Sequence, residues 1–193
     1  MKHVLPMLVA LCWFGGCDEG RPAPEAPNTA TASSAEGIPA TFFTSSRPEQ
    51  AAFLNDVKTS ASPGDSVVFL ARVGGKVDPF VENLAMFIAA DPSLQSCEIM
   101  GKHDHCPVPQ DYCCEDPDLL RLGLATVQFT SPEGRIIPAT AEGAGGLESL
   151  KFVVVEGEVR DRNNEGLFIV DARKVWVGGK PTYDDRMRGS MTP

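Results

Sequence analysis

The sequence lacks the features that mark membrane-spanning and nucleic-acid-binding proteins. Its apolar stretch VLPMLVALCWF, residues 4–14, is shorter than the about 20 residues that a membrane-spanning helix needs. Basic residues are few, with 17 Lys and Arg against 26 Asp and Glu and a net charge of −9, and no run interleaves them with aromatic residues. Because affinity for nucleic acid depends on Lys and Arg contacts to phosphate, we expect no nucleic-acid partner.

Catalytic motifs are missing as well. No Gly-x-Ser-x-Gly segment is present, and a Ser-His-Asp set in the body of the chain could draw only on His103 or His105. No Cys-x-x-Cys pair is present, which is the spacing common in redox enzymes and zinc knuckles. The sequence therefore predicts a protein that is not an enzyme.

The amino terminus carries an export pattern. A short positive start precedes the apolar stretch, which has the length of the apolar region of a secretory signal. Gly15 and Gly16 then precede Cys17, and this junction resembles the lipobox of bacterial lipoproteins, with Phe14 in place of the usual Leu. The resemblance implies a signal peptide at residues 1–17 and attachment of lipid, such as palmitate, to Cys17. The alternatives are an ordinary signal peptide cut near this point or a buried apolar strand.

Residues 18–40 form a polar segment. They are rich in Pro, Ala, Ser, Thr and Glu and contain almost nothing to bury. Such a segment cannot offset the entropy cost of ordering, so we expect a disordered tether. A signal, a cysteine, a polar tether and a folded body together predict an exported protein. Its lipid would anchor it to a membrane of the bacterial cell envelope, in the periplasm or facing the surface.

The body of the chain predicts a short helix followed by strands. A capping-box spacing between Ser46 and Glu49 favours a helix within residues 41–64, with Phe53, Leu54 and Val57 buried. Alternating apolar residues predict five strands near 67–73, 84–90, 124–130, 152–159 and 167–177, with a frayed tail at 178–193. Asn and Gly in the loop between the last two strands favour a hairpin, and broken parity at Arg173 predicts a bulge.

The strand order and the ending VVVEGEV…LFIVDARKVWV resemble an OB-fold barrel over residues 65–177. The predicted fold class is mainly β: a small five-stranded OB-like barrel with a cysteine-rich insertion, residues 91–122, between strands two and three. The chain also resembles uncharacterised exported bacterial lipoproteins with a similar Cys-Pro-x-Pro-x-Asp-Tyr-Cys-Cys segment, which brings no known activity. OB barrels commonly bind ligands across strands two and three. The resemblance therefore implies a non-catalytic binding or interaction module for an envelope protein or a small ligand.

Four cysteines remain in the exported body: Cys97, Cys106, Cys113 and Cys114. Outside the cytosol, an even set in a loop-rich segment most often forms disulfides. A bond between the adjacent Cys113 and Cys114 is the most strained choice. Cys97 and Cys106 would therefore each pair with one of these two, and both arrangements stay open.

Metal binding is the alternative function of the same segment. His103, His105, Cys106 and Cys97 offer imidazole and thiolate ligands, which suit zinc or copper. No other cofactor is expected. A third interpretation is thiol–disulfide cycling by Cys113 and Cys114.

Overall fold

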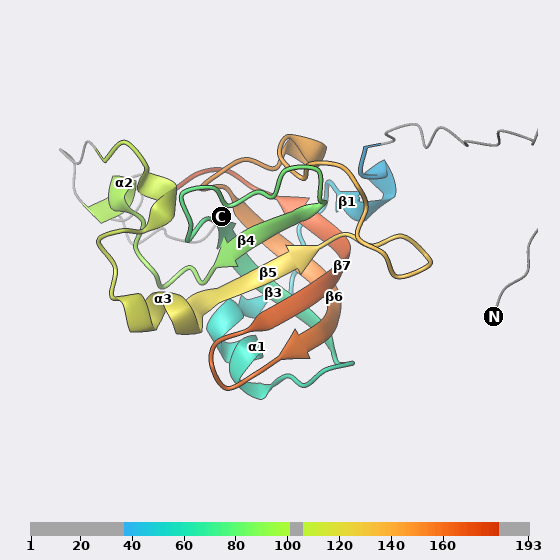
Figure 1. The fold of residues 1–193 in the computed structure, drawn as a ribbon, viewed down its shortest axis with the longest axis horizontal. Coiled ribbons are helices and arrows are strands. Elements are labelled where there is room, and N and C mark those ends of the chain that lie inside the picture. Colours follow the sequence, from blue (N-terminus) through green and yellow to red (C-terminus); the bar gives the residue numbers. More distant parts are fainter. Residues whose placement is uncertain (1–36, 101–105, 182–193) are drawn as a thin grey trace, which may run out of the picture. The chain divides into compact units, whose positions relative to one another are not determined.

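The computed structural model describes residues 37–100 and 106–181 (Figure 1). The predicted signal peptide, Cys17 and most of the tether lie outside these residues, as do His103, His105 and the end of the tail. In the described ranges, no helix has the length and apolar character needed to cross a membrane.

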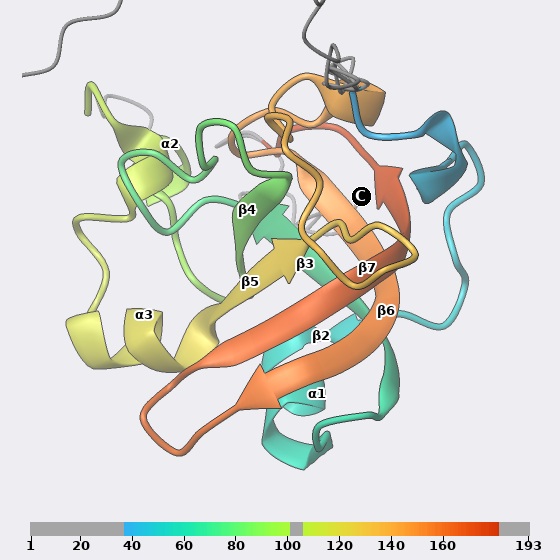
Figure 2. The same cartoon turned by 45° about the vertical axis from the view of Figure 1, so that its right-hand side comes forward.

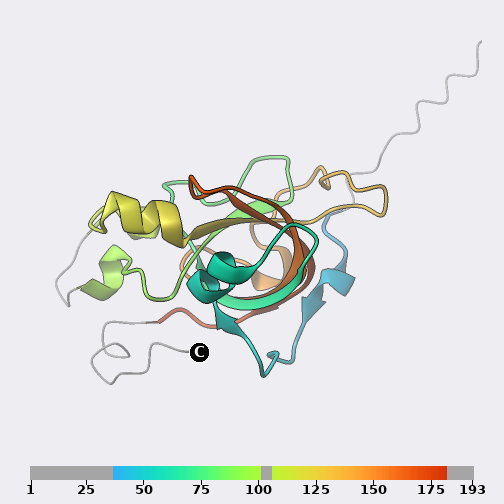
Figure 3. The same ribbon diagram turned by 90° about the horizontal axis from the view of Figure 1, so that it is seen from below.

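The described residues form a closed, mainly β barrel of OB type, as the sequence predicted. Five strands pair in the circular order β3–β4–β5–β7–β6–β3, and only the β5–β7 pair is parallel. Two short strands, β1 and β2, add in parallel to β7 and β3. Figures 2 and 3 show the sheet curving round on itself. The strands are β1 Phe43–Thr44, β2 Ala52–Phe53, β3 Ser66–Val73, β4 Met86–Ala90, β5 Leu124–Gln128, β6 Phe152–Arg162 and β7 Phe168–Val177.

Alternation of side chains places one face of each long strand inside the barrel. On β3, Phe69 and Val73 are fully buried, and on β6 so are Val153 and Val155. Burying each such side chain stabilises the fold by about 1.5–3 kcal/mol, an upper bound because the unfolded chain is already partly compact. The predicted bulge is confirmed, because the β6–β7 register shifts so that Arg173 has no partner across the ladder.

The predicted capping box is wrong. Helix α1 spans Leu54–Ser60, begins after Phe53, and has no side-chain cap. Phe53 is 41% exposed rather than buried. The reason is tertiary: β1 pairs with β7 and β2 pairs with β3, so backbone pairing holds the lead-in extended where local spacing favoured a helix. A 3₁₀ turn at Ala144–Gly146 lies between β5 and β6.

The insertion lies between β4 and β5, the second and third strands of the barrel, as predicted. It contains α2 Cys97–Met100, a 3₁₀ turn Pro109–Asp111 and α3 Pro117–Gly123. The Asp116 carboxylate accepts hydrogen bonds from two backbone amides of the first turn of α3, and Pro117 starts that helix. Figures 1 and 2 show α2 and α3 on the same side of the barrel. A small apolar cluster that includes Leu94 and Tyr112 attaches the insertion to the barrel.

Candidate functional site

The four cysteines of the insertion come together in space. The Cys97 sulfur lies 3.5 Å from that of Cys113 and 3.6 Å from that of Cys114. The Cys106 sulfur lies 3.8 Å from that of Cys113. A disulfide has a sulfur–sulfur distance of about 2.05 Å, so no bridge joins the described cysteines. The structure thus assembles a thiol cluster from residues up to 17 positions apart.

The thiols of the cluster differ in environment. Cys97 is buried at the start of α2, and its burial raises the pKa of its thiol, with hydrogen bonds to Cys113 and Cys114 adding to the effect. Cys113 and Cys114 are exposed. Hydrogen bonds from Cys97 and then Cys106 lower the pKa of Cys113, because they stabilise its thiolate. The cluster therefore has one buried thiol, that of Cys97, and two thiols exposed to solvent, those of Cys113 and Cys114.

A buried arginine of the barrel contacts the first arm of the cluster, which is the chain segment around Cys97. Arg72 on β3 is fully buried and forms an ion pair with Glu98 at 2.6 Å. Its guanidinium also donates to the Ser96 hydroxyl at 2.7 Å and to the Leu150 carbonyl at 3.2 and 3.1 Å. Ser96 and Glu98 flank Cys97, so these contacts fix the backbone that carries the buried thiol.

The same arginine also contacts the second arm of the cluster, which is the chain segment around Cys113. Its guanidinium lies 6.0 Å from the ring centroid of Tyr112, the residue immediately before Cys113. Tyr112 is fully buried in a left-handed conformation at φ 57°. Its ring packs against Gly74, where an added Cβ would lie 2.7 Å from the ring. Arg72 on β3 thus makes contacts to both chain segments that supply the thiols.

Two polar atoms beside this ion pair are buried without a hydrogen-bond partner among the described residues. They are the second carboxylate oxygen of Glu98 and the hydroxyl of Tyr112. Burial raises the pKa of Tyr112 to about 12, so the phenol stays protonated at neutral pH. Buried polar groups normally have partners, so these atoms mark the least satisfied polar region next to the cluster.

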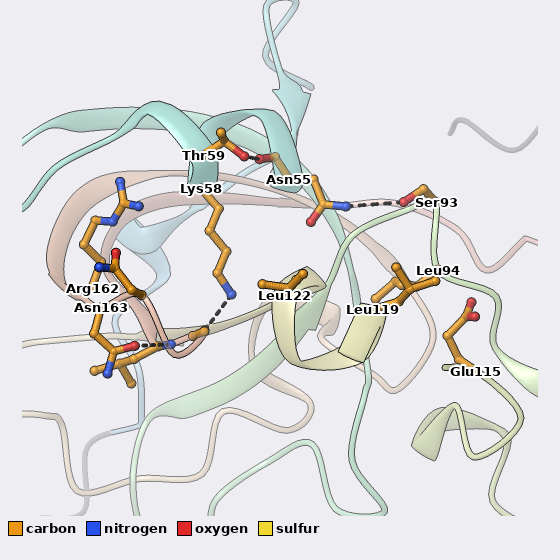
Figure 4. Close-up of a pocket in the computed structure, with 13 residues that line it drawn as sticks. Asn55, Lys58, Thr59, Ser93, Leu94, Glu115, Leu119, Leu122, Arg162 and Asn163 are labelled. Atoms are coloured by element: carbon orange, nitrogen blue, oxygen red, sulfur yellow. Dashed lines mark hydrogen bonds between the residues drawn. The ribbon is translucent and has the colours of Figure 1, made fainter. Parts of the chain in front are cut away.

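A groove of about 660 Å³ lies between α1, α3 and the β6–β7 loop. Figure 4 shows Lys58 extending from α1 into it, with Arg162 and Asn163 on one side and Leu119 and Leu122 on the other. The Lys58 ammonium donates to the carbonyls of Leu124 and Gly166, both at 2.6 Å. Lys58 therefore ties α1 to the end of the insertion and to the hairpin loop.

Burial, and then the charges of Arg121 and Arg162, lower the pKa of Lys58 from 10.5 to about 8. The ammonium has its donors committed to main-chain carbonyls. These hydrogen bonds give Lys58 a structural role in the fold. The residues that line the groove do not identify a ligand.

No protein-family model, curated protein or solved structure matches this chain.

The four cysteines are recognisable in the sequence, whereas the residue that organises them is not. Arg72 lies on the face of β3 opposite the barrel interior, where alternation alone does not reveal burial. The signal was a single arginine in an apolar strand, VVFLARV. The structure brings Cys97 and Cys106, two of the four predicted metal ligands, close to Cys113, while the other two, His103 and His105, lie outside the described residues.

Proposed function

We propose that this chain is an exported, lipid-anchored protein of the bacterial cell envelope that binds a soft metal ion, zinc or copper, at its cysteine cluster. The barrel is a non-catalytic binding module, and the insertion between β4 and β5 carries its site. The observation that carries the proposal is the spacing of the sulfur atoms.

Four thiolates around zinc at about 2.3 Å form a tetrahedron whose edges are about 3.8 Å. The three contacts of the cluster, at 3.5, 3.6 and 3.8 Å, are close to that edge. Three of the sulfurs, those of Cys97, Cys113 and Cys114, lie within 4.8 Å of one another. Thiolate donors select zinc and Cu(I) over hard cations. Cys106 lies outside this group of three, and its sulfur, 3.8 Å from that of Cys113, would move toward Cys97 and Cys114 to supply a fourth thiolate.

Preorganisation supports the proposal further. A metal site needs its ligands in place, because ordering them on binding costs conformational entropy. Here Arg72 contacts the segments on both sides of the cluster. The closed barrel beneath them is a rigid base for a site built on loops.

The cellular location is supported by the sequence pattern. An apolar signal followed by Cys17 and a polar tether at residues 18–40 would place the barrel close to a membrane surface. In that compartment a thiolate site persists when the ion binds before the thiols oxidise. Two disulfides stay the prediction for protein that is exported without metal.

Elemental analysis of protein exported by its own signal tests the proposal. We expect one zinc or copper ion per chain, lost in Cys97→Ser and in Cys113→Ser and retained in Ser60→Ala, a matched control on α1. A count of reduced thiols is made on the same sample. Protein that is exported without metal and takes up no zinc or copper after its four cysteines are reduced would reject metal binding and leave a stapled, purely structural insertion.

A further inference from the structure

One pairing of the sulfur contacts uses each cysteine once without joining the adjacent Cys113 and Cys114, whose bridge would be strained. Cys97 and Cys114 are 3.6 Å apart, and Cys106 and Cys113 are 3.8 Å apart. These two contacts share no sulfur atom, so both pairs can react at the same time. The shortest contact, from Cys97 to Cys113, shares an atom with each of them.

We propose that the cluster has a second, oxidised state with disulfides Cys97–Cys114 and Cys106–Cys113, and that forming these bonds releases the metal ion. The pairing is carried by the geometry alone. The release of an ion rests on the proposed function. Metal binding and disulfide formation are then two exclusive states of one site, which makes metal occupancy depend on the redox poise of the envelope.

The chemistry balances with a small disulfide, such as oxidised glutathione, as the oxidant. For each bridge, one thiolate attacks a sulfur of the oxidant, which forms a mixed disulfide and expels one thiolate. The neighbouring cysteine then displaces the second thiolate and closes the bridge. Two bridges remove four electrons and reduce two oxidant molecules to four thiols, which take up four protons from solvent. The four protein thiolates lose their charge, so zinc leaves as a divalent ion.

Little movement is needed to reach the oxidised state. Each pair must shorten from its present separation to about 2.05 Å, a change of less than about 2 Å that side-chain rotation can supply. The contacts of Arg72 to Ser96, Glu98 and Tyr112 do not involve a sulfur atom. They can hold both arms in place while the sulfur atoms change partners.

The experiment uses reduced protein loaded with zinc and then treated with oxidised glutathione. A chromogenic zinc chelator follows release, and alkylation of reduced thiols follows oxidation. We expect one zinc ion released as the four thiols are lost. The disulfide-linked peptides are then partially reduced and differentially alkylated. Mass spectrometry of these peptides identifies the partner of Cys113 and the partner of Cys114.

Pairs of serine substitutions give an independent reading of the pairing. Cys97→Ser/Cys114→Ser leaves Cys106 with Cys113, and the matched control Cys97→Ser/Cys113→Ser leaves Cys106 with Cys114. We expect the first variant to close its bridge about tenfold faster or more. Its two sulfur atoms already lie 3.8 Å apart, and the rate of thiol–disulfide exchange depends on access of one sulfur to the other. Circular dichroism checks that both variants keep the β fold.

The outcomes separate the two proposals. A reduced protein that binds no zinc but closes Cys97–Cys114 and Cys106–Cys113 rejects the proposed function and keeps the pairing. Zinc that binds but stays bound after four thiols are lost rejects the release. Bridges Cys97–Cys113 and Cys106–Cys114, a vicinal bridge, or equal closure rates in the two variants would overturn the pairing.

Discussion

Replacing Arg72 by Met tests the central structural claim, that one buried cation organises the cysteine insertion. Arg72 is fully buried, and the Glu98 side chain is 27% exposed. The substitution keeps the apolar stem but removes the donors to Ser96, Glu98 and Leu150. The carboxylate of Glu98 is then left partly buried without its counter-ion.

Breaking a buried ion pair by removing one partner typically costs about 3–5 kcal/mol. Because the Glu98 side chain is only partly buried, we expect about 3 kcal/mol, the low end of that range. A domain of this size has a free energy of unfolding of about 5–15 kcal/mol, so the loss is readily measured. Arg72→Lys keeps a charge but loses the planar guanidinium and its contact with the Tyr112 ring. Its free energy of unfolding should therefore lie between those of Arg72→Met and the wild type.

Urea unfolding followed by circular dichroism gives the free energy of each variant. Glu98→Gln and the double variant Arg72→Met/Glu98→Gln complete a cycle, and we expect a coupling of about 1 kcal/mol or more between contacting residues. Zinc affinity should fall in Arg72→Met, because both arms of the cluster lose their common contact. An Arg72→Met protein within about 0.5 kcal/mol of the wild type would refute the reasoning, since that is the range of inert surface changes.

Three further predictions concern Lys58, Tyr112 and Gly157. Because burial lowers the pKa of Lys58 from 10.5 to about 8, the unfolded chain binds more protons between these values. The free energy of unfolding of the wild type, measured in urea relative to Lys58→Met, should therefore rise with pH from 8 to 10.5, and a flat difference would contradict the lowered pKa. Tyr112→Phe removes a buried hydroxyl with no partner among the described residues, so we expect equal or greater stability in the same assay, and a loss above about 1 kcal/mol would reveal a hydrogen bond. Gly157→Ala would place a Cβ 2.5 Å from the Asp171 carbonyl oxygen at the bulge. Its melting temperature should drop by an amount corresponding to about 1–3 kcal/mol, and an unchanged midpoint would argue against this close approach.

The strands and their order were predictable because a barrel wall has a local signature. Alternation along β3 and β6 places every second side chain inward, and the bulge at Arg173 was visible as a break in parity. The helix start was not predictable. Ser46 and Glu49 have the spacing of a cap, but β1 and β2 pair with strands more than 15 residues away, and local spacing carries no information about such partners.

By itself, the sequence determined the fold class, the place of the insertion and the four candidate thiols, because these depend on short-range periodicity and on residue identity. Only the tertiary structure decided which sulfur atoms meet, and that those of Cys97, Cys113 and Cys114 lie within 4.8 Å of one another. It also decided that Arg72 is buried at the centre of the insertion's contacts. The physical reason is that these facts depend on long-range contacts across a closed barrel. A residue's neighbours in space there come from strands and loops that are distant in the chain.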